Sequence, residues 1–237
     1  MADLINPTAT YLKAVLECDE SGIAVYRATL TKRLNQAAST VSQTVNRMES
    51  EGLFLALPED RQIYLSQAGR RAALNIMRKH RLAEVFLVNV IELELALVHN
   101  EASAWEHAMS DMVTDRLDSI LAHPKSSPFG NHIPTSQEVT TGRWTNPITG
   151  ERLNALRYSF DHDADTPATV HSLGEPLQEN VDMMRRMEAV GLLPGAQVLV
   201  ERSRSAIEVS VVGQQRSPLE FDLLDASNIF VLDTPSL

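Results

Sequence analysis

The chain has 237 residues, of which 43% are hydrophobic and 22% charged, a balance typical of a globular protein with room for one large domain or two to three small ones. Its single cysteine, Cys18, excludes an intrachain disulfide framework and a cysteine-rich zinc site, and we interpret it as a packing residue of a helix. The N-terminus lacks a basic region followed by an apolar run, and no stretch reaches the ~18 apolar residues of a membrane span. We therefore expect a cytoplasmic protein that is neither exported nor inserted into a membrane.

The formal net charge of -10 is distributed unevenly along the chain. Residues 1–81 carry 11 Lys and Arg against 8 Asp and Glu, whereas residues 82–237 carry 10 against 23. Charges more than about 10 Å apart are largely screened at cellular salt, so the acidic part does not prevent the first part from attracting phosphate groups. The composition is therefore compatible with nucleic-acid binding.

A helix-turn-helix is predicted near the N-terminus. In its second helix Val41, Val45 and Met48 recur at i, i+4 and i+7, which buries one stripe and turns the polar residues outward. Gly52 then ends the helix. About four residues join this helix to the one before it, as in DNA-binding helix-turn-helix proteins. The predicted helices of this region span residues 10–16, 28–34 and 39–51.

A β-hairpin is predicted directly after these helices, with strands at residues 53–57 and 62–65 around a turn that ends at Arg61. Helix-turn-helix shapes also occur in many all-α proteins, but a hairpin at this place is the wing of a winged-helix protein, which contacts the DNA backbone. Gln can bond adenine in the major groove, and Ser, Thr and Arg can hold phosphates. The predicted DNA contacts are Arg27, Ser39, Thr40, Ser42, Gln43, Thr44, Arg47 and Arg61.

Two longer helices are predicted next, one capped by Ser66 and running to about residue 91, the other spanning residues 101–121. The first carries His80 and Glu84 four residues apart, which places both side chains on one face. One such pair is commonly a surface ion pair, but a second set at similar spacing indicates a site for Mn, Fe, Co, Ni or Zn. That second set is His99, Ser103, Glu106 and His107.

Several motifs within residues 1–134 are informative when taken together. They are Arg27-Ala28, STVSQTVNRME at 39–49, MRKHRLAE at 77–84, WEHAMSD at 105–111 and SPFGN at 127–131. These motifs resemble the diphtheria toxin repressor family. The resemblance implies a bacterial iron- or manganese-dependent repressor that binds palindromic double-stranded DNA operators of metal-homeostasis genes as a homodimer, with two metal sites per subunit. It also implies a winged-helix domain, a helical dimerisation domain and often a tethered small β-barrel.

The resemblance also implies the residues of each site. Counting back from Gly195, which resembles the glycine before a barrel strand, gives a Glu and a Gln that complete the ancillary metal site. That site is then His80, Glu84, His99, Glu175 and Gln178, and the residues that hold an anion beside it are Arg81, Ser127 and Asn131.

The primary, activating site matches the family only in part. Glu106 and His107 match, whereas Thr10 and Ser103 stand where iron regulators have Met and Cys. Replacing sulfur by hydroxyl oxygen gives a harder ligand set, which favours Mn(II) slightly over Fe(II) as the co-repressor.

The C-terminal part is predicted to form a small β-barrel of the Src-homology type after an irregular linker. A helix is expected at 175–190, where Met183, Met184 and Met187 are interpreted as core residues. The fold is therefore expected to be mainly α with β. The predicted strands are 197–201, 207–212, 218–223 and 228–232. The predicted domains are 1–72 (winged helix), 73–134 (helical dimerisation and metal binding), 135–167 (linker or irregular insertion) and 168–237 (barrel).

Two other classes of function remain open at this point. A metallohydrolase needs a metal with an open coordination position and a positioned base, and Glu106 and His107 are adjacent rather than spaced as in the His-Glu-x-x-His motif. A DNA-binding regulator that senses no metal would bind DNA equally well in the presence of a chelator. The sequence favours the metal-dependent repressor over both.

Overall fold

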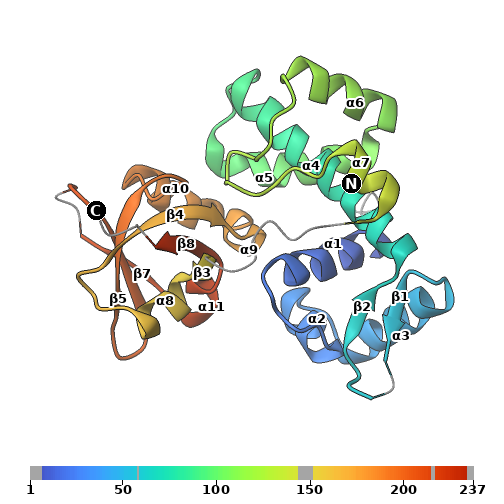
Figure 1. Cartoon of the computed structure of the whole chain (residues 1–237), viewed down its shortest axis with the longest axis horizontal. Coiled ribbons are helices and arrows are strands. Elements are labelled where there is room, and N and C mark those ends of the chain that lie inside the picture. The colour runs from blue at the N-terminus through green and yellow to red at the C-terminus, as the bar shows by residue number, and fades with distance from the viewer. Residues whose placement is uncertain (1–6, 58, 144–151, 215–216, 234–237) are drawn as a thin grey trace. The chain divides into compact units, whose positions relative to one another are not determined.

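A computed structural model describes residues 7–57, 59–143, 152–214 and 217–233 (Figure 1). By their contacts the residues form two compact units, one made of 1–83, 103–122 and 133–147, the other of 84–102, 123–132 and 148–237. Among the described helices, none combines the length and the apolar character needed to cross a bilayer.

The first unit begins with three helices, α1 (Pro7–Glu20), α2 (Arg27–Arg33) and α3 (Ala38–Ser50) (Figure 1). Their ends lie within a few residues of the predicted ones. The apolar stripe of α3 is buried against the other two helices, in one core with Leu12 and Leu30. Each of these side chains removes apolar surface from water, so the stripe fixes which face of α3 remains outside. The stripe consists of Val41, Val45 and Met48.

The predicted hairpin is present as β1 (Phe54–Ala56) and β2 (Ile63–Leu65), which pair antiparallel with Phe54 opposite Leu65 (Figure 1). The Ile63 amide donates to the carbonyl of Val25 at 2.8 Å, which ties the hairpin to the loop before α2. Arg61 has a φ of 58°, the left-handed conformation that lets the chain reverse at this turn.

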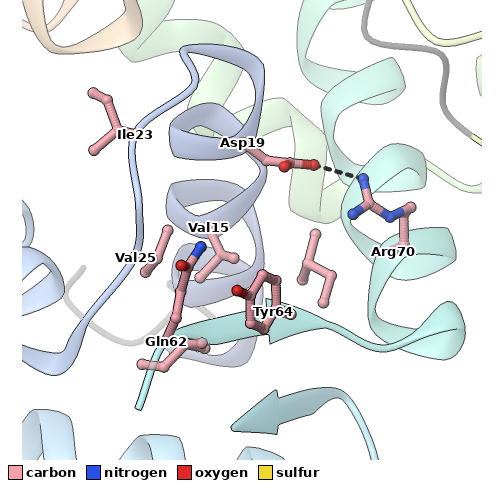
Figure 2. Close-up of a pocket in the computed structure, with 9 residues that line it drawn as sticks. Val15, Asp19, Ile23, Val25, Gln62, Tyr64 and Arg70 are labelled. Atoms are coloured by element: carbon pink, nitrogen blue, oxygen red, sulfur yellow. Dashed lines mark hydrogen bonds and ion pairs between the residues drawn. The ribbon is translucent and has the colours of Figure 1, made fainter. Parts of the chain in front are cut away.

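A small cavity lies where the hairpin meets α1 (Figure 2). Val15, Val25 and Tyr64 are among its lining residues, and Asp19 and Arg70 form an ion pair at 2.7 Å beside it. Its volume of about 30 Å³ accommodates about one water molecule, whereas sites for organic ligands are roughly tenfold larger. This cavity is therefore no site for an organic co-repressor.

Helix α4 (Gln67–Asn89) follows the hairpin and passes from the first unit into the second. The Ser66 hydroxyl accepts from the Gly69 amide at 2.9 Å, which confirms the predicted cap. Gly69 lies against the backbone of Leu53, and a Cβ at this position would overlap the Leu53 carbonyl. The glycine thus lets the first turn of α4 contact the segment that leads into the hairpin.

The single helix predicted at 101–121 is wrong, because the structure has two helices there, α5 (Leu95–Ala108) and α6 (Asp111–Ile120). Ser110 has an extended backbone, and its hydroxyl accepts from the Val113 amide at 3.3 Å. A serine at this place satisfies an amide at the start of a new helix, and so the chain turns instead of continuing. Beyond α6 the first unit contains α7 (Ser136–Thr141), which ends at the left-handed Gly142.

The second unit contains a six-stranded antiparallel sheet in the order β3-β8-β4-β5-β6-β7 (Figure 1). Four of its strands lie at the predicted positions. The other two, β3 and β4, were not predicted, because they lie in the segment expected to be a linker or just beyond it. Strand β4 nevertheless has the alternation of a strand, since Ala168, Val170 and Ser172 are buried. The strands are β3 (Arg152–Asn154), β4 (Pro167–Leu173), β5 (Gln197–Arg202), β6 (Ile207–Val211), β7 (Leu219–Phe221) and β8 (Ile229–Asp233).

Among the described residues, four helices lie between these strands in the sequence. The single helix predicted at 175–190 is wrong, because the chain breaks at Asn180, whose side chain accepts from the Met183 amide at 3.1 Å. Met183, Met184 and Met187 are buried, in agreement with their interpretation as core residues. The helices are α8 (Ala155–Asp161), α9 (Glu175–Gln178), α10 (Val181–Ala189) and α11 (Leu223–Ala226).

Cys18 is buried in the core of the first unit, as expected for a packing residue. Burial raises the pKa of its thiol to about 11, since the charged thiolate is poorly solvated there. The thiol is therefore neutral at physiological pH and is a poor metal ligand.

We predict that Gly69→Ala destabilises the protein by about 1–3 kcal/mol, because the added methyl group forces α4 away from Leu53. Urea unfolding monitored by circular dichroism measures the change. Gln67→Ala, at an exposed position of the same helical turn, is the control and should stay within about 0.5 kcal/mol of the parent. Equal stability of the two variants would show that the close approach at Gly69 is unimportant.

Candidate metal centre

Helices α4 and α5 bring three of the predicted metal ligands to their buried faces. Glu84 lies one turn after His80 on α4, and its Oε1 is 3.6 Å from Nδ1 of His99 on α5. All three side chains are buried. Since α4 is one continuous helix, its 5.4 Å pitch sets the spacing of His80 and Glu84.

Helix α9 contributes two further polar side chains, Glu175 and Gln178, which are one turn apart. Oε1 of Gln178 lies 3.1 Å from Nδ1 of His99, and Nε2 of Gln178 donates to the Leu173 carbonyl at 2.7 Å. The second hydrogen bond fixes the amide so that its oxygen faces the imidazole. Both α9 side chains are buried.

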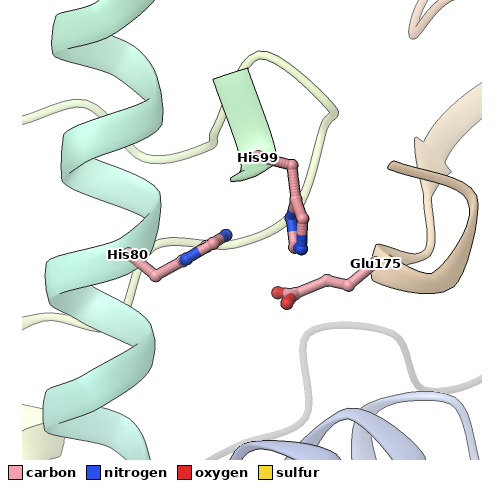
Figure 3. A group of neighbouring side chains, drawn as sticks. All are labelled: His80, His99 and Glu175. Atoms are coloured by element: carbon pink, nitrogen blue, oxygen red, sulfur yellow. The ribbon is translucent and has the colours of Figure 1, made fainter. Parts of the chain in front are cut away.

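Ligand atoms of His80, His99 and Glu175 lie within 4.8 Å of one another (Figure 3). With the side chains of Glu84 and Gln178, which contact or flank this group, the available donors are two imidazole nitrogens, two carboxylates and one amide oxygen. All five residues are at most 4% exposed.

Burial makes this group a good host for a divalent cation. An ionised carboxylate that leaves water loses several kcal/mol of solvation, and the loss is recovered only next to a positive charge or several donors. Nitrogen and oxygen ligands without sulfur suit Mn, Fe, Co, Ni or Zn. The chemistry of the donor set therefore fits the metal that the sequence predicts.

The loop 127–131 holds the end of β4 next to α9. The Phe129 carbonyl accepts from the Leu173 amide at 2.9 Å, and Asn131 Nδ2 donates to the Leu173 carbonyl at 2.8 Å. The same carbonyl accepts from Gln178, so Asn131 and Gln178 are fixed by one backbone oxygen. Gly130 packs on the backbone of His171 too closely to leave room for a Cβ.

The residues expected to hold an anion have protein partners in this structure. Arg81 on α4 donates twice to Glu20 on α1, at 2.8 and 2.7 Å, and both side chains are buried. The Ser127 hydroxyl accepts from the Phe129 amide at 3.2 Å, and Asn131 donates to Leu173. Anion binding by Arg81, Ser127 and Asn131 stays a prediction. The sequence analysis missed Glu20, which no pattern distinguishes from its acidic neighbours.

The residues expected at the primary site have a different environment. Oε2 of Glu106 lies 2.7 Å from Nδ1 of His80 and 3.4 Å from Nζ of Lys13, while Oε1 lies 3.6 Å from Nε2 of His107. Thr10 on α1 and Ser103 on α5 are half-buried. Sequence reasoning missed Lys13, although its position one helical turn after Thr10 placed it on the same face.

The residues expected to contact DNA lie on α2, α3 and the hairpin turn, and none is buried. Gln43 is exposed on the side of α3 opposite the Val41 stripe. Arg27 donates to Asn46 at 2.7 Å and Arg47 to Glu51 at 3.2 Å, so both guanidinium groups lie along the outer face of α3. The exposed members are Ser39, Thr40, Gln43, Arg47 and Arg61, and the half-buried ones are Arg27, Ser42 and Thr44.

A winged helix-turn-helix combined with a buried nitrogen and oxygen donor set defines a class of proteins, the metal-dependent DNA-binding regulators. Comparison with known proteins supports this class. The N-terminal DNA-binding domain of iron-dependent repressors matches residues 3–58, and their metal-binding and dimerisation domain matches residues 66–135.

Relatives match almost the whole chain. The iron-dependent repressor IdeR of Mycobacterium tuberculosis is 37% identical over 233 residues, which cover 97% of this chain and 99% of IdeR. The diphtheria toxin repressor of Corynebacterium diphtheriae is 37% identical over 205 residues, which cover 85% and 88% of the two chains. A manganese-dependent transcriptional repressor in complex with manganese superposes with a TM-score of 0.75 at 26% identity and covers 96% of this chain and 100% of its own.

The chain therefore belongs to the iron-dependent repressor family, which includes the diphtheria toxin repressor. This confirms the resemblance recognised in the sequence. The protein is a metal-dependent transcriptional repressor and not an enzyme, so the metallohydrolase and the metal-independent regulator are both rejected. The matched domains imply that its partners are DNA and a second copy of the chain.

Proposed function

We propose that a divalent metal held by the ancillary set activates this homodimeric repressor for binding to palindromic operators of metal-homeostasis genes in the cytoplasm. The observation that carries the proposal is the burial of two carboxylates and two imidazoles in one group, with the Gln178 amide next to His99. A bound cation explains why such a costly arrangement is retained. The ancillary set is His80, Glu84, His99, Glu175 and Gln178.

We propose Mn(II) as the slightly favoured co-repressor over Fe(II). The five side chains of the ancillary set offer oxygen and nitrogen but no sulfur, and hard ligands suit Mn(II). The preference is small, because Fe(II) accepts the same atoms and binds more tightly in the usual order of affinities. The relatives differ in the same way, since IdeR is named iron-dependent and the 26% identical structure contains manganese.

The metal is proposed to shift a conformational equilibrium rather than to build the fold. The winged-helix core buries its apolar residues by itself, and a ligand shifts an equilibrium only through its different affinity for the two states. Helix α4 offers the physical connection, because its first turn contacts Leu53 at Gly69 and its later turns carry His80 and Glu84. Coupling of this kind is typically worth about 1–3 kcal/mol.

We predict that Mn(II) strengthens operator binding by the parent protein by about 5- to 150-fold relative to a chelator-treated sample. Gln178→Ala removes the oxygen next to His99 and should raise the Mn(II) concentration needed for half-activation about 10-fold or more. Fluorescence anisotropy with labelled operator DNA measures both. Gln197→Ala, an exposed position on β5, is the matched control.

Operator affinity that a chelator leaves unchanged would contradict the metal-dependent activation. If Gln178→Ala required the same Mn(II) concentration as Gln197→Ala, this result would show that Gln178 on α9 does not contribute to the metal site.

We further propose that Gln43 contacts a base and Arg47 a phosphate, since both are exposed on α3 away from its buried stripe. Gln43→Ala should cost about 1–3 kcal/mol of operator binding and relax the preference at one base pair. Arg47→Ala should weaken binding to all sequences alike and lower the salt dependence by about one charge. Anisotropy with a set of single-base operator variants distinguishes the two effects, and an unchanged base preference in Gln43→Ala would refute its role.

A further inference from the structure

The strongest unexplained feature of the first unit is a buried cluster of Lys13, His80 and Glu106. Nζ of Lys13 lies 3.4 Å from Oε2 of Glu106 and 3.3 Å from Nδ1 of His80, and the same imidazole nitrogen lies 2.7 Å from that carboxylate oxygen. The Lys13 side chain is 12% exposed, Glu106 5% and His80 fully buried. An ammonium group thus reaches from α1 to the carboxylate expected to bind the primary metal.

A lysine at this place performs the electrostatic task of a metal ion. A buried carboxylate is stabilised by a nearby positive charge, and an ammonium supplies one without coordination chemistry. A cation bound to Oε1 of Glu106, the oxygen 3.6 Å from Nε2 of His107, would lie close to the Lys13 ammonium at 3.4 Å from Oε2, and the two positive charges would repel each other. Lys13 and a primary metal therefore compete for the same carboxylate.

The other positions of the primary site are also poor for metal. Thr10 and Ser103 offer neutral hydroxyls where a tight site needs charged or soft ligands. Lys13 is one turn after Thr10, so the face of α1 that would complete the site presents an ammonium group and a hydroxyl. The residues of the primary site therefore do not fit a bound metal.

The geometry supports a different role for Glu106, which is to orient the imidazole ring of His80. At 2.7 Å the Nδ1–H of His80 donates to Oε2 of Glu106, which fixes the ring and leaves Nε2 as the nitrogen with a lone pair. Metal-binding histidines commonly donate their other nitrogen to a carboxylate in this way, and the carboxylate strengthens the ligand. Glu106 is then a positioning residue for His80.

We infer that Lys13 permanently occupies the cation position of the primary site, so that each subunit binds one activating metal ion, at the ancillary set, with Glu106 orienting His80. The inference rests on the proposed function of the ancillary set. It replaces the two metal sites per subunit that the family resemblance implies.

Metal stoichiometry tests the inference directly. Full-length protein freed of metal with a chelator is dialysed against excess Mn(II), and bound metal per subunit is measured by mass spectrometry of the digested sample. We expect one Mn(II) per subunit in the parent and in Lys13→Arg, which keeps the charge. Two ions per parent subunit would overturn the inference but not the proposed function, whereas no bound ion would overturn the proposed function.

A set of variants separates the role of Lys13 from general packing. Thr10→Met with Ser103→Cys, which restores the sulfur ligands, should still bind one ion while Lys13 is present. Adding Lys13→Ala to this pair should raise the number to two, measured with Co(II) as a softer probe. A second ion in the pair without Lys13→Ala would show that the ammonium does not block the site.

If the triple variant does not fold, the melting temperatures and Mn(II) affinities of single variants test the inference instead. Lys13→Met in the otherwise unchanged protein removes the compensating charge, so the metal-free protein should melt at a lower temperature, while Lys13→Arg should melt close to the parent. Glu106→Gln should weaken Mn(II) binding about 10- to 100-fold without lowering the stoichiometry, as expected for loss of a carboxylate that orients a ligand. A Lys13→Met melting temperature equal to that of the parent would contradict the proposed charge compensation.

Discussion

The structure depends on how buried carboxylates are neutralised. Glu84 and Glu175 lie with two imidazoles in one buried group, while Glu106 is neutralised by Lys13 and Glu20 by Arg81. Lone ionised groups in such surroundings would cost several kcal/mol each. The protein therefore uses built-in cations in the first unit and leaves the group around Glu84 suited to an ion from solution. This difference separates fixed structural charges from the proposed metal site.

Helix α4 carries or contacts most of these charged side chains. Its first turn packs against Leu53 next to the hairpin, and its later turns carry Arg81 as well as two proposed metal ligands. Helix α1 presents Lys13 and Glu20 to the same helix and packs against α2 and β2. A change in the position of α4 must therefore act on the charged contacts of α1. We propose these contacts as the physical route by which metal binding reaches the DNA-binding helices.

Local patterns were sufficient to predict much of the fold. The Val41 stripe and the hairpin were both recognised, because periodicity and turn residues are properties of neighbouring positions. The breaks at Ser110 and Asn180 were missed, since a polar residue inside a periodic stretch looks like part of one helix until its side chain is seen to cap the next. Strand β4 was hidden by the polar residues that surround it.

The metal centre could be predicted only in part, for a similar reason. His80 and Glu84 share a helix, so their spacing was informative, whereas Gln178 was found only through a family resemblance because it meets His99 by tertiary folding. Lys13 could not be found by searching for metal ligands, since we infer that its ammonium takes the place of the metal ion and not of a ligand. The contact between Lys13 and Glu106 is therefore visible only in three dimensions.

X-ray absorption at the manganese edge of the Mn(II)-loaded protein identifies the atoms bound to the metal and so tests whether the ancillary set holds it. We expect a single class of site with oxygen and nitrogen neighbours only, and with two imidazole rings, from His80 and His99. Replacing His99 by Gln should remove one ring from the signal. A sulfur neighbour, or a spectrum without imidazole, would show that the ancillary set does not hold the metal.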